Sequence, residues 1–297
     1  MSHTSVLLNE SIAALQLTKG MTILDATFGA GGHSRAIAEI IGKEGHLISF
    51  DADHTVFTPS KTQELERLTH FTPVVENFRN IAEVFKRLGD ISLNGALFDL
   101  GLSSTQLERS GRGFSFQRDE PLQMTFAHNL NEGDVTAATI LNEWSAETLA
   151  TIFEGFGEER FARSIAKGIT EARKVRPFTR TGQLVEVIHN HTPHRYHYGR
   201  THFATRTFQA LRMAANDELG AIEHGISSVL PLMKQGGRIA VISFHSIEDR
   251  AVKRLFQSFV DDGRAVRISK KPIIATEEEL MANPRARSAK LRIIEKI

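Results

Sequence analysis

The chain has 297 residues, of which 41% are hydrophobic and 24% charged, proportions typical of a soluble globular protein. The lack of cysteine excludes disulfides, thiolate metal sites and a cysteine nucleophile, and no apolar run is long enough to cross a membrane. The N-terminus also lacks a signal-peptide pattern, so we expect a cytoplasmic protein. The formal net charge is only +1.

The first predicted elements surround a glycine-rich turn. An apolar run at residues 21–24 predicts a strand, and residues 34–41 predict a helix. Between them lies the segment DATFGAGGH, residues 25–33. Strand, glycine turn and helix form the opening unit of a nucleotide-binding α/β sheet.

The residues of this turn distinguish between ligands. Gly29, Gly31 and Gly32 let the backbone turn sharply and approach a ligand closely. Their spacing matches neither the GxGxxG dinucleotide fingerprint nor a P-loop, and Asp25 would repel a pyrophosphate. S-adenosylmethionine, which carries an ammonium group and no phosphate, fits such a turn better.

Three further apolar segments, residues 46–50, 95–98 and 238–244, have the lengths of buried parallel strands. The last two are about 140 residues apart, so a segment is inserted between them. Helical periodicity at residues 146–153, 158–173 and 181–190 predicts an all-α insertion. We therefore predict a class I, Rossmann-like α/β fold, a doubly wound sheet formed by residues 1–106 and 206–297, with a helical domain at 107–205.

The elements after the insertion complete the predicted core. A long helix is expected at residues 205–230, followed by a tight turn at 234–237 that leads into the strand at 238–244. Period-two alternation at residues 288–295 predicts a half-exposed antiparallel strand at one edge of the sheet. Residues 269–287 are expected to form a loop.

Acidic residues end three of the predicted strands: Asp25, Asp51 and Asp99. Ligands of open α/β sheets bind beyond the carboxyl ends of the strands, so these carboxylates are candidate cofactor contacts. Asp51 stands where an acid would accept hydrogen bonds from ribose hydroxyls. Asp53, two residues later, is the less favoured alternative.

Asp99 is also the leading catalytic candidate. A carboxylate that accepts a hydrogen bond from an exocyclic amine helps to localise its lone pair for methyl transfer. The alternative is that Asp99 only holds the cofactor, in which case His245 or the Ser103–Ser104 pair would be the catalytic candidates. Without a cysteine, methylation of a pyrimidine C5 is disfavoured, which leaves nitrogen or oxygen as the target atom.

Residues 160–212 contain eleven Lys and Arg against two acids, and five histidines. This stretch is interpreted either as a solvated helical face or as a surface that binds a polyanion. The spacing of the histidines matches no standard metal site, and we expect no metal. The candidate RNA or substrate contacts are Arg112, Phe114, Phe116, Arg173, Lys174, Arg176, Arg206 and Phe244.

Eight segments resemble, in the same order, the bacterial 16S rRNA cytosine N4-methyltransferase family of the MraW type. They cover nearly the whole chain: HTSVLLNE (3–10), DATFGAGGHS (25–34), DLGLSSTQ (99–106), RGFSF (112–116), GEERFA (157–162), ATRTFQALR (204–212), ISFHSIEDR (242–250) and NPRARSAKLR (283–292).

The resemblance implies an S-adenosylmethionine-dependent enzyme that methylates N4 of cytosine 1402 in 16S rRNA of the 30S subunit. The cofactor positions of the family would fall on Gly31, Gly32, His33, Asp51, Phe78, Asp99 and Gln106. An N-methyltransferase acting on another RNA or DNA is the alternative. The oligomeric state, monomer or homodimer, is left open.

The chain departs from the family pattern at two places. It has PLQMTFA at residues 121–127, where PLDMRMD is common, and HFATR at 202–206, where HPATR is usual. The changed residues Gln123, Thr125, Ala127 and Phe203 put part of the target pocket in question. A dehydrogenase, an RNA-binding module without catalysis and a small-molecule methyltransferase are competing interpretations; each explains only part of the pattern.

Overall fold

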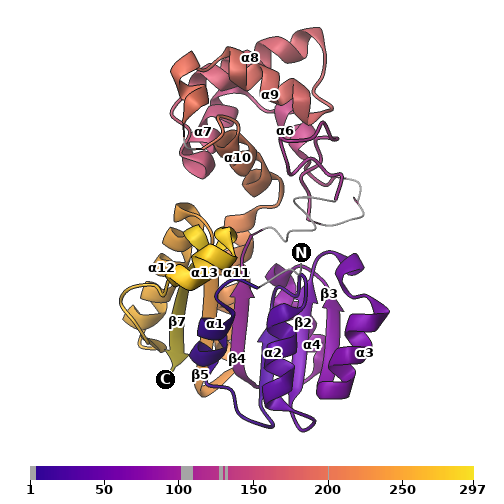
Figure 1. Cartoon of the computed structure of the whole chain (residues 1–297), viewed down its shortest axis with the longest axis vertical. Coiled ribbons are helices and arrows are strands. Elements are labelled where there is room, and N and C mark those ends of the chain that lie inside the picture. The colour runs from indigo at the N-terminus through magenta and orange to yellow at the C-terminus, as the bar shows by residue number, and fades with distance from the viewer. Residues whose placement is uncertain (1–4, 102–109, 127–129, 131–132, 200) are drawn as a thin grey trace. The chain divides into compact units, whose positions relative to one another are not determined.

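The structure, a computed structural model, describes residues 5–101, 110–126, 130, 133–199 and 201–297. The chain divides into two compact units (Figure 1). Unit 1 comprises Met1–Gly101 and Leu219–Ile297, and unit 2 comprises Leu102–Glu218. We predicted these boundaries after residues 106 and 205; the second lies further along the chain, after Glu218.

Unit 1 is built on a seven-stranded sheet with the order β3-β2-β1-β4-β5-β7-β6. Strands β1 to β5 pair in parallel, whereas β7 is antiparallel to both β5 and β6. The strands are β1 (Thr22–Asp25), β2 (His46–Asp51), β3 (His70–Val75), β4 (Leu93–Asp99), β5 (Met233–Ser243), β6 (Ala265–Arg267) and β7 (Lys290–Lys296). This is the predicted α/β class, and its parallel strands bring their carboxyl ends to one edge.

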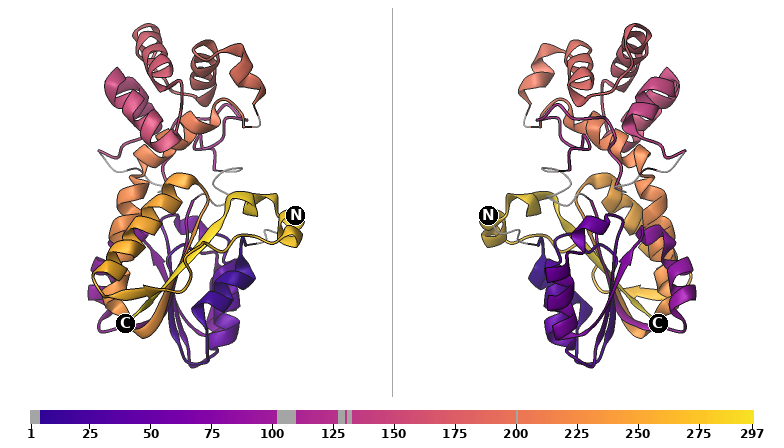
Figure 2. Two further views of the ribbon diagram at one scale, coloured as in Figure 1. Left: turned by 90° about the vertical axis from the view of Figure 1, so that its left-hand side faces the viewer. Right: turned by 90° about the vertical axis from the view of Figure 1, so that its right-hand side faces the viewer.

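Helices cover both faces of this sheet (Figure 2). Successive strand residues alternate between two apolar clusters: Leu47 of β2 belongs to one, and Ile48 and Phe50 to the other. The sequences of the parallel strands are therefore continuous apolar runs, because both faces of the sheet are buried. One face is covered by α1 (Leu8–Leu15), α2 (Gly32–Ile41) and α3 (Pro59–Leu68), and the other by α4 (Ile81–Leu88), α11 (Glu218–Leu232) and α12 (Ser246–Asp261).

The C-terminal part of the sheet differs from the prediction. Strand β7 lies between β5 and β6, so the predicted edge position is wrong, and β6 forms the edge. The residues predicted to form a turn at 234–237 already belong to β5. The predicted loop at 269–287 contains α13 (Glu277–Ala282) and the start of the 3₁₀ helix η4 (Pro284–Ser288).

Unit 2 is helical and has its own apolar core. Its described helices are α6 (Ala137–Glu143), α7 (Ala146–Gly157), α8 (Ala162–Val175), α9 (Thr181–Asn190), the 3₁₀ helix η3 (His194–Tyr198) and α10 (Thr205–Ala215). No helix in the described part of either unit is long and apolar enough to cross a membrane.

The predicted start of α8 is wrong. Glu158 ends α7 in a left-handed conformation, with φ 50°, and Glu159 is buried before α8 begins. The Glu159 carboxylate accepts hydrogen bonds from the Phe161 amide at 2.9 Å and the Tyr196 hydroxyl at 2.8 Å. Glu159 therefore links the residues before α8 to η3, whereas Glu158 ends α7, and neither acid lies within α8.

The single long helix predicted at residues 205–230 is two helices, α10 and α11. Asn216 ends α10, and Asp217 follows in a left-handed conformation with φ 44°. The Asn216 side chain donates to the Met124 carbonyl at 2.6 Å and accepts from the Phe126 amide at 2.7 Å. Tertiary hydrogen bonds therefore interrupt a sequence that is otherwise compatible with one helix.

Candidate active site

The glycine turn connects β1 to α2 and is held by Asp51. The Gly29 amide, in a residue with φ 51°, donates to Oδ2 of Asp51 at 2.8 Å. Gly31, with φ 87°, forms the N-cap of α2. A Cβ on Gly32 would collide with Oγ of Ser5, so the N-terminal segment passes closely over the turn. The glycines serve both the backbone conformation and this close approach.

Three carboxylates stand at the ends of adjacent strands, as predicted. Asp25 pairs in register with Ser49 of β2 and Leu97 of β4. Its own side chain is fully buried, and its carboxylate accepts from Oγ of Ser34 at 2.6 Å and from the Thr27 amide at 3.1 Å. Asp25 therefore anchors the turn from inside, while Asp51 and Asp99 are less deeply placed.

Asp51 and Asp53 have different partners. Each oxygen of Asp51 accepts one backbone amide, from Gly29 and from Asp53 itself, and retains a further lone pair. Asp53 is buried, and its Oδ1 accepts from both the amide and the hydroxyl of Thr55 as the cap of a 3₁₀ turn. This geometry favours Asp51 as the ribose contact.

Asp99 ends β4 and contacts His33. Its backbone amide donates to the Thr27 hydroxyl at 2.7 Å, which joins it to the glycine turn. Its Oδ2 lies 3.5 Å from Nδ1 of His33, a buried side chain. Oδ1 of Asp99 is buried and has no hydrogen-bond partner among the described residues. A buried acceptor without a partner is costly unless a ligand satisfies it.

The contact of His33 with the Val6 carbonyl shows that ring nitrogen Nε2 carries hydrogen. Nε2 lies 3.2 Å from the Val6 carbonyl oxygen, which can only accept, so Nε2 carries hydrogen. Nδ1 faces Oδ2 of Asp99, so His33 links Asp99 to the N-terminal segment.

Burial controls the ionisation of all three acids. It is the largest cause that raises the pKa of Asp25, Asp51 and Asp99 to about 6 in each case. The Asp25 charge raises the pKa of both other carboxyls further, whereas His33 lowers that of Asp99. A ligand with positive charge would stabilise these carboxylates.

The end of β5 carries two other predicted residues. The Phe244 amide donates to Oε2 of Glu248 at 2.8 Å, and a Cβ on Gly101 would lie 3.4 Å from the Phe244 ring. His245 accepts from the Glu248 amide through Nδ1 at 3.3 Å, and its Nε2 lies 3.1 Å from Oε1 of Glu248. Both ring nitrogens are thus engaged, so His245 is a poor candidate for a general base.

Other predicted positions follow β3 and β4. Phe78 lies in the 3₁₀ helix η2 (Phe78–Asn80), with its ring edge-on to Phe98 at 5.6 Å between centroids. A Cβ on Gly225 of α11 would come within 2.7 Å of that ring. Ser103, Ser104 and Gln106 lie outside the described residues, as does Ala127 of the departing segment.

Two predicted RNA contacts lie inside unit 2. Arg112 is buried and donates to the Phe126 carbonyl at 2.9 Å, and Phe114 is buried in the core of the unit. Their burial favours packing over RNA contact. Phe116 is only partly buried, and its ring stacks on His202 at 4.3 Å between centroids.

The residues of the departing segments occupy different environments. Thr125 is buried, whereas the Gln123 backbone carbonyl accepts from the amide of Ala137. Phe203 stacks on His202 and packs near His197.

The histidine rings of residues 189–202 stack with one another and with phenylalanine. Among the described residues these histidines form no three-ligand cluster.

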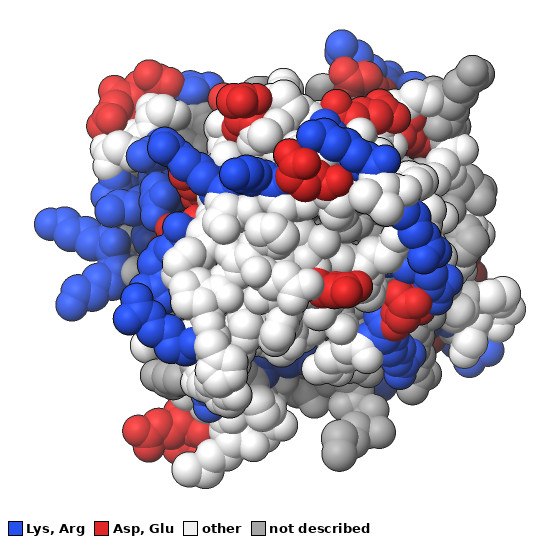
Figure 3. Space-filling model, turned by 90° about the horizontal axis from the view of Figure 1, so that it is seen from above, with Lys and Arg blue, Asp and Glu red and all other residues white. Residues whose placement is uncertain are grey.

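The basic stretch is not one continuous surface. Arg173 donates to the carbonyls of Leu141 and Trp144 at 2.9 and 2.7 Å, and so caps the end of α6. Lys174 pairs with Glu171, whereas Arg176 is exposed. Arg206 donates to the Glu158 carbonyl. On the face seen in Figure 3, Lys and Arg gather at the margins of an uncharged area, with acids between them.

The His33–Asp99 contact and the Thr27 hydroxyl that supports Asp99 were not predicted from the sequence. Both connect segments that are more than 60 residues apart, and only the register of β1 with β4 brings them together. The buried hydroxyl of Ser34 was also missed, although its place one residue after the turn was a usable signal.

A sequence profile of the MraW methylase family matches residues 1–297. Two curated relatives named ribosomal RNA small subunit methyltransferase H come from Magnetococcus marinus and Trichlorobacter lovleyi. They are 42% and 43% identical, over 99% of this chain and 98% of each relative. An rRNA methylase structure from Streptococcus thermophilus, 9% identical over 100% of this chain and 99% of its own, has a TM-score of 0.42, a likeness too distant to add to these matches.

Proposed function

The chain belongs to the MraW methylase family, and we propose that it methylates N4 of cytosine 1402 in 16S rRNA of the small ribosomal subunit. It is an S-adenosylmethionine-dependent methyltransferase. The observation that carries the proposal is that Oδ1 of Asp99 is a buried acceptor without a described partner. Asp99 ends β4, the strand that pairs with β1 beside the glycine turn, and a reacting amine would need a hydrogen-bond acceptor at this place.

The residues around the turn fit the cofactor. The glycine backbone admits a close ligand, and Asp51 has acceptor capacity left for two ribose hydroxyls. The carboxylates of Asp51 and Asp99 would complement the positive charge of the ligand. When bound, S-adenosylmethionine supplies a sulfonium methyl group for in-line displacement.

Asp99 is suited to bind and deprotonate an exocyclic amine. Its Oδ1, as the ionised acid, would accept an N–H of cytosine N4 and then take the proton released after methyl transfer. His33 holds the other oxygen, and the Thr27 hydroxyl holds the backbone, so the carboxylate has a set orientation. Orientation of this kind supplies much of the rate of an in-line transfer.

Unit 2 is the proposed RNA-recognition domain. It contains the whole basic stretch, residues 160–212, and its exposed cations, such as Arg176, could contact phosphates. The stacked Phe116 and His202 are partly accessible aromatic rings of the kind on which unpaired bases stack. Arg112 and Phe114 would support this surface from within.

The direct test is to incubate the protein with labelled S-adenosylmethionine and unmodified 30S subunits, digest the rRNA and identify the methylated nucleoside. We expect N4-methylcytidine in the fragment that contains position 1402. Label in another nucleoside, or only in another RNA or in DNA, would replace the proposed target with the alternative N-methyltransferase activity. No transfer to any nucleic acid would overturn the proposal.

A further inference from the structure

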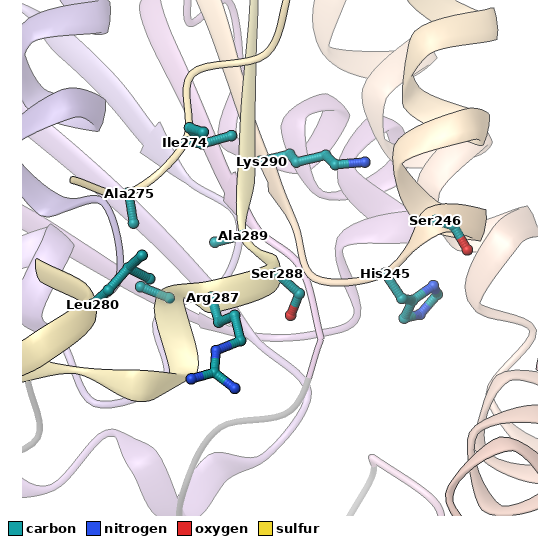
Figure 4. Close-up of a pocket in the computed structure, with 10 residues that line it drawn as sticks. His245, Ser246, Ile274, Ala275, Leu280, Arg287, Ser288, Ala289 and Lys290 are labelled. Carbon is teal, nitrogen blue, oxygen red and sulfur yellow. The ribbon is translucent and has the colours of Figure 1, made fainter. Parts of the chain in front are cut away.

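A cavity in unit 1 lies beside the end of β5. It has a volume of about 230 Å³ and is bordered by the start of α12, the loop before α13, η4 and the start of β7 (Figure 4). Its lining residues are His245, Ser246, Ile274, Ala275, Leu280, Ala286, Arg287, Ser288, Ala289 and Lys290. The NPRARS segment, to which the cofactor and catalytic proposals assign nothing, thus forms one wall.

The lining combines an apolar wall with a polar rim. Ile274, Ala275 and Leu280 form part of the wall, and Ser246 and Ser288 bring hydroxyl groups. Figure 4 shows the side chains of Arg287 and Ser288 on the same side of their segment. An apolar surface with a few polar groups is the usual composition of a ligand site.

Only one of the two cations at the cavity is available to a ligand. Nζ of Lys290 lies 3.1 Å from Oδ2 of Asp249, which also pairs with Arg292 at 2.6 Å. Arg287 is exposed and forms no hydrogen bond or ion pair through its side chain within the described part of the chain. Its planar guanidinium can bind two oxygens of a phosphate.

The cavity lies next to the reacting end of the sheet but away from the glycine turn. Asp99 pairs in register with Ile242, and His245 follows three residues later, about 10 Å at the rise of an extended chain. The glycine turn follows β1, on the other side of β4 in the strand order. A ligand here would therefore adjoin the target base rather than the cofactor.

The size of the cavity limits the ligand. Sites for drug-sized molecules measure about 300–1,000 Å³, so this smaller cavity suits one base or one ribose with its phosphate. We propose that it binds the nucleotide adjacent to the target cytosine in the RNA strand. The base or ribose contacts the apolar wall, and Arg287 binds the phosphate. This inference rests on the proposed function and assigns a substrate contact in unit 1.

The test compares Arg287→Ala with Arg254→Ala, which removes an exposed arginine from α12 outside the cavity. We expect Arg287→Ala to raise KM for 30S subunits about tenfold, the effect of one charge-assisted contact. The slope of log K for binding a short single-stranded RNA against log salt should fall by about 0.7. Affinity for S-adenosylmethionine should match the wild type.

A second variant, Ala275→Phe, fills the cavity without changing charge. We expect a similar rise in KM for 30S subunits with an unchanged salt slope, because the added ring excludes the base or ribose while Arg287 keeps its charge. If Arg287→Ala matches Arg254→Ala in both KM and slope, or if Ala275→Phe leaves KM unchanged, the inference is overturned. Failure of the proposed function would instead appear as a wild-type protein without activity on 30S subunits.

Discussion

Asp99 combines two features: a buried acceptor oxygen without a described partner, and a second oxygen 3.5 Å from Nδ1 of the buried His33. An acid that only stabilised the fold would be expected to satisfy both oxygens. Here Oδ1 of Asp99 stays available to a ligand, while Oδ2 contacts His33. Such a residue is suited to act on a ligand that completes its hydrogen bonds.

Replacement of Asp99 by Asn tests this role, because an amide NH₂ can donate to Nδ1 of His33 and leave the amide oxygen in the place of Oδ1. Shape and acceptor are then retained and only the charge is lost. We expect the single-turnover methylation rate to fall at least about 100-fold, with less than about a tenfold change in S-adenosylmethionine affinity. Asp90→Asn, an exposed acid of the same unit, is the control. Equal losses in rate and affinity would assign Asp99 to cofactor binding alone.

Asp51 and Asp53 provide a second comparison at this scale. We expect Asp51→Ala to weaken S-adenosylmethionine binding by about 1.5–3 kcal/mol for each ribose hydrogen bond that is lost, the range for a hydrogen bond to a charged group. Asp53→Ala removes the cap on Thr55 and should change affinity less. Calorimetry on both folded variants measures the affinity for S-adenosylmethionine. A larger loss of affinity for Asp53→Ala than for Asp51→Ala would make Asp53 the ribose contact.

At the scale of the elements, the Asn216 side chain forms three hydrogen bonds at the break between α10 and α11. Asn216 bonds to Met124 and Phe126, residues 92 and 90 positions earlier, and also to the carbonyl of Arg212. The Arg212 side chain itself pairs with Glu218 across the break, at 2.7 Å. The break is thus stabilised within unit 2.

We expect Asn216→Ala to lower the free energy of unfolding of unit 2 by about 1–3 kcal/mol, because the Phe126 amide and the Met124 carbonyl lose their partner. Thermal unfolding, with hydrogen exchange to locate the change, measures this effect. Asn190→Ala, at the exposed end of α9, should have little effect. If both variants unfold alike, the break is determined by the backbone and not by Asn216.

The strands and the end of α10 show which elements the sequence could predict and which it could not. Apolar runs identified β1, β2, β4 and β5 because strands buried on both faces leave a strong pattern. Strand β3 was missed because it lies at the edge of the sheet and contains Pro73. The end of α10 could not be found locally, since its cause lies in hydrogen bonds to a segment about 90 residues away.

In the candidate site, too, local features could be predicted from the sequence, whereas features that depend on tertiary contacts could not. Strand ends and glycines are local features, so Asp51 and the turn were accessible from the sequence. The pairing of His33 with Asp99, the burial of Arg112 and Phe114 and the capping role of Arg173 depend on tertiary contacts. Charge counting in particular could not separate a cation that binds its own chain from one that faces solvent.

At the scale of the whole molecule, unit 1 carries the proposed chemistry and unit 2 contains the whole basic stretch, residues 160–212. We expect the double change Lys174→Glu and Arg176→Glu to weaken 30S binding and to reduce the salt slope by about 0.7–0.9 for each phosphate that these two side chains neutralise. S-adenosylmethionine affinity should not change. Arg173 is left intact because it caps α6.

The matched control for that variant is Lys86→Glu with Arg87→Glu, an exposed pair at the end of α4 in unit 1. A loss of 30S binding confined to the unit 2 variant supports RNA contact by the basic stretch. Equal binding and equal slopes in the two variants would instead mean that residues 174 and 176 are ordinary solvated surface.

The ionisation of the site couples pH to both stability and cofactor binding. Burial raises the pKa of Asp25, Asp51 and Asp99 from 3.8 to about 6. Between these values the folded protein binds more protons than the unfolded chain. The contribution of these acids to stability is therefore fully present below pH 3.8 and is lost as the pH rises through about 6.

Other groups act in the opposite direction, because burial lowers the pKa of His46 to about 4, and its contribution to stability is lost as the pH falls. The measurement is therefore a difference: the free energy of unfolding of the wild type minus that of Asp51→Asn, without cofactor, from about pH 4 to about pH 8. We expect this difference to decrease as the pH rises through about 6. Affinity for S-adenosylmethionine should increase over the same interval, because the cationic ligand binds the ionised carboxylates. An affinity that is constant from about pH 5 to about pH 8 would show that the carboxylates do not face the charge of the cofactor.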